Sequence, residues 1–289
     1  LLDTAKNNQN IELFFNNPNR ALFDFLPSSC FDSLKNITTH LYCATKDLQG
    51  IVDAAGNINI KSHFESFRAD SVNGNICKAC GMEELAIFRA STPEGEQWRA
   101  DFDHQLCKSK YPLFAVHPDN LVPLCSICNQ DAKKAKDLFF KKPNQPRNAF
   151  YPYTESAHSF IEINLDMLKD LEPEITVIWR ANDKNTLEKL ETWDDVYEIK
   201  HRVEGRFRSL EKIILNEINP NCYAHFDQQV KDRARTVPDE VLRDKEWGFW
   251  YQKLFHKLSQ VDKAAFWQKS RFSNLQGNDG GAYILREEK

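Results

Sequence analysis

Two Cys-x-x-Cys pairs constrain the fold of this chain more than any other feature. Cys77 and Cys80 form the first pair, and Cys125 and Cys128 form the second. Thiolates two residues apart can bind one ion from a tight turn, and four thiolates complete a tetrahedral zinc site. The alternatives are four buried free cysteines or a redox pair, but no βαβ pattern surrounds either pair. We therefore expect a closed, structural Zn²⁺ that joins two distant segments.

The composition is that of an ordinary globular protein. Of 289 residues, 41% are hydrophobic and 28% charged, which allows more than one core. No stretch approaches the ~18 apolar residues that span a bilayer, so no membrane association is expected. Without a signal-peptide pattern, paired cysteines favour metal binding in the reducing cytoplasm. The net charge of −4 excludes a wholly basic nucleic-acid coat but permits a local basic face.

Hydrophobic periodicity predicts an α+β, mostly helical chain in three segments. These are a mixed, mostly helical segment 1–71, a metal-binding module 72–142 and a mostly helical domain 143–289. The sequence predicts strands and helices from alternating and three-to-four-residue apolar spacing, respectively. The expected strands are 85–89, 98–102, 121–124 and 174–179. The expected helices are 33–42, 129–140, 186–218 (with one break near 193) and 238–258.

Polar residues with the chemistry of a phosphodiesterase lie between and beside the cysteine pairs. They are Asp103, His104, Asn120 and Asn129. Asp-His, then an Asn 16 residues later, then Cys-x-x-Cys-Asn resembles the HNH endonuclease family over residues 72–142. The resemblance implies a ββα-metal fold, with two strands and a helix around one divalent cation. In this family the last position is often His, whereas this chain has Asn129.

The residue types suit hydrolysis of a phosphodiester bond. His104 is suited to taking a proton from water at neutral pH. Asp103 and Asn129 offer hard oxygen ligands for a catalytic Mg²⁺ or Mn²⁺. We expect Asn120 to brace the long loop and orient the imidazole. The alternative is that these are ordinary capping and turn residues around a zinc site without catalysis.

A local basic run follows the second cysteine pair. We expect Lys133 and Lys134 to contact substrate phosphates, and the run continues to Arg147 with Lys136, Lys141 and Lys142. An ordinary solvated helix face is the alternative interpretation.

The sequence of the long loop, residues 108–116 and 120–125, also resembles stand-alone bacterial HNH proteins of Septu-like or retron-associated anti-phage systems. That resemblance implies a DNase that works with an ATPase or another regulatory partner. The helical flanks then either dock this partner or cover the small module's apolar faces. Two other functions stay open: a non-catalytic zinc-ribbon module that binds DNA, and a DNase toxin that needs an immunity partner.

Overall fold

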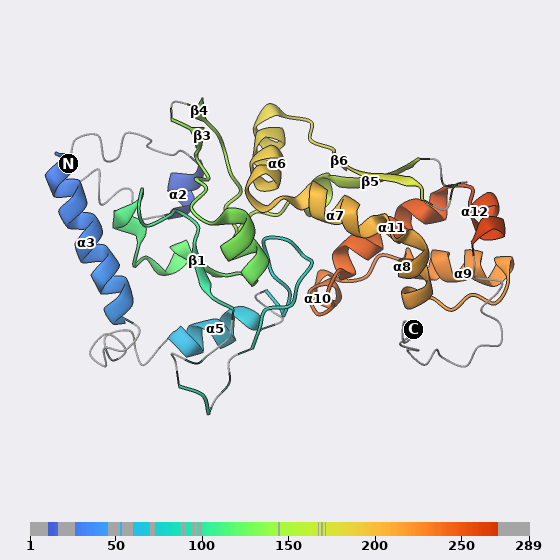
Figure 1. The fold of residues 1–289 in the computed structure, drawn as a ribbon, viewed down its shortest axis with the longest axis horizontal. Coiled ribbons are helices and arrows are strands. Elements are labelled where there is room, and N and C mark those ends of the chain that lie inside the picture. Colours follow the sequence, from blue (N-terminus) through green and yellow to red (C-terminus); the bar gives the residue numbers. More distant parts are fainter. Residues whose placement is uncertain are drawn as a thin grey trace, which may run out of the picture. The chain divides into compact units, whose positions relative to one another are not determined.

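The computed structural model describes residues 11–16, 27–45, 53, 60–69, 73–87, 89, 91–93, 96, 100–143, 145–166, 168, 170 and 172–270. The chain is α+β, with about half of the described residues in helices and the strands among them in two-stranded sheets, which confirms the expected mixed class (Figure 1). None of the helices in this part of the chain is long and apolar enough to cross a membrane.

The chain divides into two compact units, and the three segments expected from the sequence stay a prediction. The first unit comprises 1–161, 179–199 and 237–249, and the second comprises 162–178, 200–236 and 250–289. The cysteine pairs and all expected site residues therefore belong to one unit, together with the N-terminal helices and two later helices, α6 (Lys184–Tyr197) and α10 (Asp239–Leu242).

Aromatic side chains from distant segments form the core of the first unit. The short helix α2 (Ile11–Asn16) buries Ile11, Phe14 and Phe15. The Phe14 ring packs against Phe139 with 5.4 Å between centroids, and the Phe15 ring packs against Phe139 at 5.0 Å. Such tilted and edge-on ring pairs favour packing beyond their buried area. The N-terminal segment is thus part of the same core as the metal-binding module.

A short antiparallel hairpin carries the first two expected site residues. Strand β1 (Phe102–His104) pairs with β2 (Leu121–Pro123), and His104 lies opposite Leu121. The loop between the strands contains two 3₁₀ turns, η2 (Pro112–Phe114) and η3 (Pro118–Asn120), each with proline in its first turn. The prediction of a strand at 121–124 is confirmed to within one residue.

The helix after the second cysteine pair is shorter and wider than expected. Instead of a helix over 129–140, the chain forms a single π-helical stretch, η4 (Ile127–Lys133). The Lys134 N–H donates to the Asn129 carbonyl at 3.0 Å, and Lys134 then leaves the helix with φ 51°. One extra residue per turn rotates Lys133 toward the interior, where it is 1% exposed. The following residues form β3 (Phe140–Lys142) and β4 (Gln145–Pro146).

The strands expected at 85–89 and 98–102 are wrong for most of their described residues. Residues 85–87, 89, 100 and 101 are irregular, and Phe102 begins β1. The Ala100 N–H donates to the Ala86 carbonyl at 3.0 Å, so the two segments do meet, but without a ladder among the described residues. Residues 88 and 97–99 lie outside the described residues, as does the apolar segment 21–26.

Three helices replace the long one expected over residues 186–218. Helix α6 (Lys184–Tyr197) belongs to the first unit and continues through Trp193, where a break was expected. It ends instead at Glu198, whose φ of 57° is the left-handed geometry of a helix cap. Helices α7 (Ile199–Phe207) and α8 (Leu210–Glu217) follow.

The second unit is built on apolar helix faces and the strands β5 (Ile161–Asp166) and β6 (Glu174–Trp179), which form one sheet. The strand predicted at 174–179 is confirmed. The helix expected at 238–258 is interrupted at Trp247, with φ 62°, and forms α10 (Asp239–Leu242) and α11 (Gly248–Gln260). The remaining helices in sequence are α3 (Ser28–Thr45), α5 (Ile60–Arg68), α9 (Tyr223–Arg233) and α12 (Ala264–Lys269).

Candidate functional site

The four cysteines of the two pairs converge on one point. The Sγ atoms of Cys77, Cys80, Cys125 and Cys128 all lie within 4.8 Å of one another, and all four residues are buried. The Cys80 and Cys125 sulfurs are 4.0 Å apart. A tetrahedral site with Zn–S bonds of about 2.3 Å separates its sulfurs by roughly 3.8 Å. The donor set and spacing therefore fit a structural zinc ion.

The backbone around this cluster already has the form of a thiolate site. The Cys125 N–H points to Cys77 Sγ and the Met82 N–H points to Cys80 Sγ, both at 3.4 Å. Gly81, with φ 65°, closes the first turn by donating its N–H to the Cys77 carbonyl at 2.8 Å. Burial raises the pKa of the Cys77 thiol well above its usual value. A bound cation is therefore needed to hold these sulfurs as thiolates.

His104 lies at the end of β1, and its imidazole is held by a hydrogen bond to the loop between β1 and β2. The ring Nε2 is 2.9 Å from the Ala115 carbonyl oxygen. A carbonyl can only accept a hydrogen bond, so Nε2 carries the proton and Nδ1 carries the lone pair in the neutral ring. In this neutral tautomer, Nδ1 is the ring nitrogen that can accept a proton.

Asn120 secures the loop that supplies this carbonyl. Its Oδ1 accepts the Leu106 N–H at 2.7 Å, and its Nδ2 donates to the carbonyls of Leu106 at 3.1 Å and Phe114 at 2.8 Å. The side chain is fully buried. Asn120 therefore ties the start of the loop at Leu106 to Phe114, the neighbour of Ala115 in the chain.

Asp103 occupies a closed polar site. Its Oδ1 accepts from Lys133 Nζ at 2.9 Å, and its Oδ2 accepts from Gln105 Nε2 at 2.9 Å. The Lys133 ammonium also donates to the His104 carbonyl at 2.7 Å. Burial raises the pKa of Asp103, while the Lys133 charge and the two hydrogen bonds oppose that effect. A protein cation thus stands where the sequence predicted a divalent ion.

Asn129 lies half-buried in the first turn of η4, directly after Cys128 of the four-cysteine cluster. Its backbone is bonded on both sides, from its own N–H to the Cys125 carbonyl and from Lys134 to its carbonyl. These bonds and the neighbouring cysteine cluster fix the backbone position from which the Asn129 side chain projects. Its role as a metal ligand stays a prediction.

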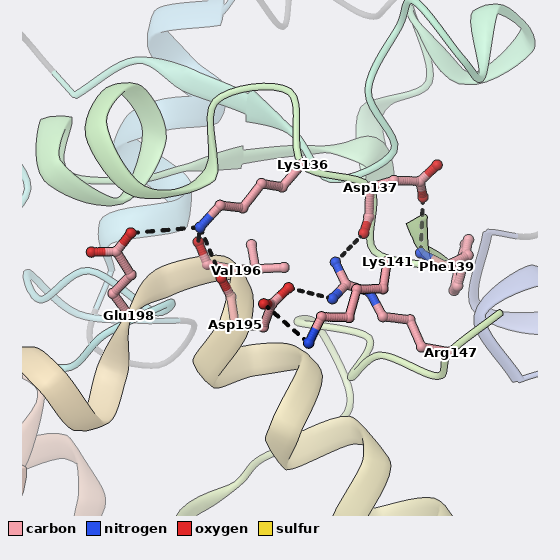
Figure 2. Close-up of polar contacts among 8 residues, drawn as sticks. All are labelled: Lys136, Asp137, Phe139, Lys141, Arg147, Asp195, Val196 and Glu198. Atoms are coloured by element: carbon pink, nitrogen blue, oxygen red, sulfur yellow. Dashed lines mark hydrogen bonds and ion pairs between the residues drawn. The ribbon is translucent and has the colours of Figure 1, made fainter. Parts of the chain in front are cut away.

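The basic run is mostly engaged by the end of α6 (Figure 2). Lys136 Nζ donates to the Asp195 carbonyl at 2.8 Å and lies 3.6 Å from a Glu198 carboxylate oxygen. The Asp195 carboxylate pairs with Arg147 at 2.5 Å and with Lys141 at 3.6 Å. Partial burial acts to raise the pKa of Asp195, but these cations hold it below its usual value.

Of the two lysines expected to contact substrate, one does not reach the surface. Lys133 is 1% exposed and paired with Asp103, so its placement does not fit a phosphate contact. Lys134 is exposed, and so is Lys142 farther along. Within the described residues neither makes an ion pair, so they are the cations of the run still open to a phosphate.

Helix α3 brings a residue to the site that the sequence gave no reason to expect. The Tyr42 ring packs edge-on against the His104 ring, with 4.5 Å between centroids. Lys108, from the loop between β1 and β2, lies over the Tyr42 ring at 5.0 Å. Gln105, Ala115 and Tyr42 were all missed, because their contributions depend on tertiary contacts or on a backbone carbonyl.

Comparison of the chain with protein-family models gives no match, and neither do comparisons with curated proteins or with solved structures. The resemblance to HNH endonucleases therefore rests on the motif residues alone.

Proposed function

We propose that this chain is a metal-dependent HNH-type endonuclease that hydrolyses phosphodiester bonds in DNA. The observation that carries the proposal is the His104 imidazole, held at the end of β1 with Nε2 donating to the Ala115 carbonyl. This hydrogen bond makes Nδ1 the proton acceptor, as activation of a water molecule requires. The order of hairpin, four-cysteine cluster and short helix also supports a ββα-metal module.

In this proposal each site residue has a separate task. His104 takes the proton from the attacking water, and Asn120 keeps the supporting carbonyl in place. Asp103 and Asn129 would hold a divalent cation such as Mg²⁺ or Mn²⁺, which supplies charge stabilisation of the phosphate and the departing oxygen. Lys134 would contact a neighbouring phosphate. The zinc ion would stabilise the module without taking part in the chemistry.

A specific observation favours a second candidate, a zinc-stabilised DNA-binding module without catalysis. The Asp103 carboxylate is already neutralised by Lys133 inside the protein, so a divalent ion must displace this ammonium to reach it. Such a module would bind DNA with a steep salt dependence and yield no cleaved product. The defence role, and a partner of the ATPase class, remain proposals that rest on the resemblance alone.

The test is cleavage of supercoiled plasmid by the zinc-loaded protein with Mg²⁺, with Mn²⁺ and with EDTA. We expect His104→Ala to fold normally and to lose about 10²- to 10⁴-fold in rate, the usual contribution of a general base. His256→Ala, at an exposed position of α11, is the matched control and should cleave like the original chain. A folded His104→Ala variant with full activity would falsify the assignment. Salt-dependent DNA binding without any cleavage would support the second candidate.

A further inference from the structure

Lys108 is a cation of the loop between β1 and β2, and none of the functions assigned above gives it a task. It lies in a tight turn that starts at Cys107, whose carbonyl accepts the N–H groups of Lys110 and Tyr111, both at 2.9 Å. These bonds fix the backbone of the turn. The Lys108 side chain therefore projects from a defined position, four residues after His104.

The Tyr42 ring contacts both Lys108 and the candidate base. The Lys108 ammonium is 5.0 Å from the centre of this ring, and the same ring packs edge-on against the His104 imidazole with 4.5 Å between centroids. The ammonium therefore lies within about 10 Å of the imidazole, which is roughly the screening length in 0.1 M salt. A phosphate that reacts at His104 thus lies in the field of this charge.

Helix α3, which carries Tyr42, is held against the same loop. The helix contacts η2, and Thr38, one turn before Tyr42, is buried with its hydroxyl donating to the Leu34 carbonyl at 2.9 Å. Residues four apart lie on one face of a helix, so Tyr42 and Thr38 share a face. The cation–π contact with Tyr42 orders the Lys108 side chain before any substrate arrives, which lowers the entropic cost of binding an anion.

The buried carboxylates beside this loop already have cations of their own. Asp103 pairs with Lys133 at 2.9 Å, and Asp137 pairs with Lys110 at 3.3 Å. Lys108 is half-buried, and within the described residues it makes no hydrogen bond or ion pair. Its three N–H donors thus remain available to an anion from outside the protein.

We propose that Lys108 binds a phosphate of the DNA strand next to the phosphate that reacts at His104. The inference rests on the proposed function and deepens it, because Lys108 takes the task that the sequence assigned to Lys133, which is buried. No hydrogen bond joins the Lys108 ammonium to the imidazole, since its described contact is the Tyr42 ring. The cation therefore suits a neighbouring phosphate and positions the strand without taking part in proton transfer.

The test is binding of a short labelled DNA duplex to the full zinc-loaded chain, without added Mg²⁺ or Mn²⁺, over about 50 to 200 mM salt. We expect Lys108→Met to bind about tenfold more weakly near 0.1 M salt, because a charge-assisted contact is lost. It should also lower the slope of log K against log salt by about one. Lys108→Arg keeps the charge and should bind like the original chain. The matched control, Lys184→Met, removes an exposed lysine from the first turn of α6 and should leave the slope unchanged.

A second measurement separates a neighbouring phosphate from the reacting one. In single-turnover cleavage with Mg²⁺ at saturating protein, Lys108→Met should keep the rate of the original chain to within about threefold, because only binding is weakened. A fall of about tenfold or more in this saturated rate would overturn the proposal, because Lys108 would then act on the reacting phosphate itself.

Each variant is first checked for zinc content and thermal unfolding, and Lys108→Gln gives the same test if Lys108→Met does not fold. The proposal is overturned if the folded variant keeps the original slope and affinity, or if Lys184→Met lowers the slope as much. It is equally overturned if Lys108→Arg binds as weakly as Lys108→Met, since the charge would then not be what matters. The proposed function can fail separately: a chain that binds DNA but cleaves none removes the nuclease, and the salt slope still decides the contact of Lys108. A chain that binds no DNA overturns both.

Discussion

The four-cysteine cluster and the Asp103 site lie in the same unit, but their charges are balanced in opposite ways. The cluster gathers four buried sulfurs within 4.8 Å and has no protein cation among its ligands. Asp103 is buried too, but Lys133 and Gln105 already bind both of its oxygens. The first site thus depends on an external ion to become charged, whereas the second is complete without one. The difference implies that the cysteine cluster needs a cation such as zinc to hold its thiolates, and that any divalent ion at Asp103 would have to compete with Lys133.

The largest expected effect tests the first half of this comparison. Cys125→Ser should abolish stoichiometric zinc binding and unfold the module, because structural zinc contributes about 10–16 kcal/mol in small metal-binding domains. Cys107→Ser is the matched control, since Cys107 is buried but lies outside the cluster. It should retain zinc and show a similar melting temperature. Zinc content and thermal unfolding measure both. A Cys125→Ser protein that keeps its zinc would remove the structural role of the cluster.

The second prediction tests whether Lys133 substitutes for a divalent ion. Lys133→Met keeps the length of the side chain but leaves the Asp103 carboxylate buried without a cation, at a cost of about 3–5 kcal/mol in unfolding free energy. Mg²⁺ should then raise the melting temperature of this variant more than that of the original chain, because the ion replaces the ammonium.

The control for that comparison removes both partners. Asp103→Asn with Lys133→Met leaves no buried charge, so it should recover most of the stability and lose the response to Mg²⁺. An equal Mg²⁺ response in all three proteins would show that the ion does not bind at Asp103.

The sequence could predict those features that depend on the spacing of residues close together in the chain. The two cysteine pairs, the strand at 121–124 and the strand at 174–179 depend on local patterns, and the structure confirms the strands and the convergence of the cysteines. The sequence also predicts that Asn120 braces its loop, and its Nδ2 donates to the carbonyls of Leu106 and Phe114. Local patterns define these features because neighbouring residues supply most of their contacts.

The features that the sequence missed depend on a changed helical geometry or on distant segments. The sequence predicted an α-helix over 129–140, whose 3.6-residue turns would set the direction of the Lys133 side chain. The structure has the π-helix η4 instead, and Lys133 points into the core. The basic run similarly looked available to DNA, whereas α6 engages Lys136, Lys141 and Arg147 (Figure 2). The sequence near the lysines does not indicate that they will pair with the acidic C-terminal end of α6, about 50 residues later.

The smallest expected effect concerns access to His104. Because the Tyr42 ring packs edge-on against the imidazole at 4.5 Å, Tyr42→Ala should expose the ring without changing its hydrogen bond to the Ala115 carbonyl. We expect diethyl pyrocarbonate to modify His104 severalfold faster in this variant, as followed by mass spectrometry of the His104 peptide. Ile37→Ala, at a position on α3 that is 58% exposed, is the control and should leave the rate unchanged. An unchanged rate in Tyr42→Ala would mean that α3 does not shield the imidazole. A faster rate would mean that α3 limits access to His104. The site would then be restricted in three ways, since Lys133 pairs with Asp103 and Asn120 holds the loop.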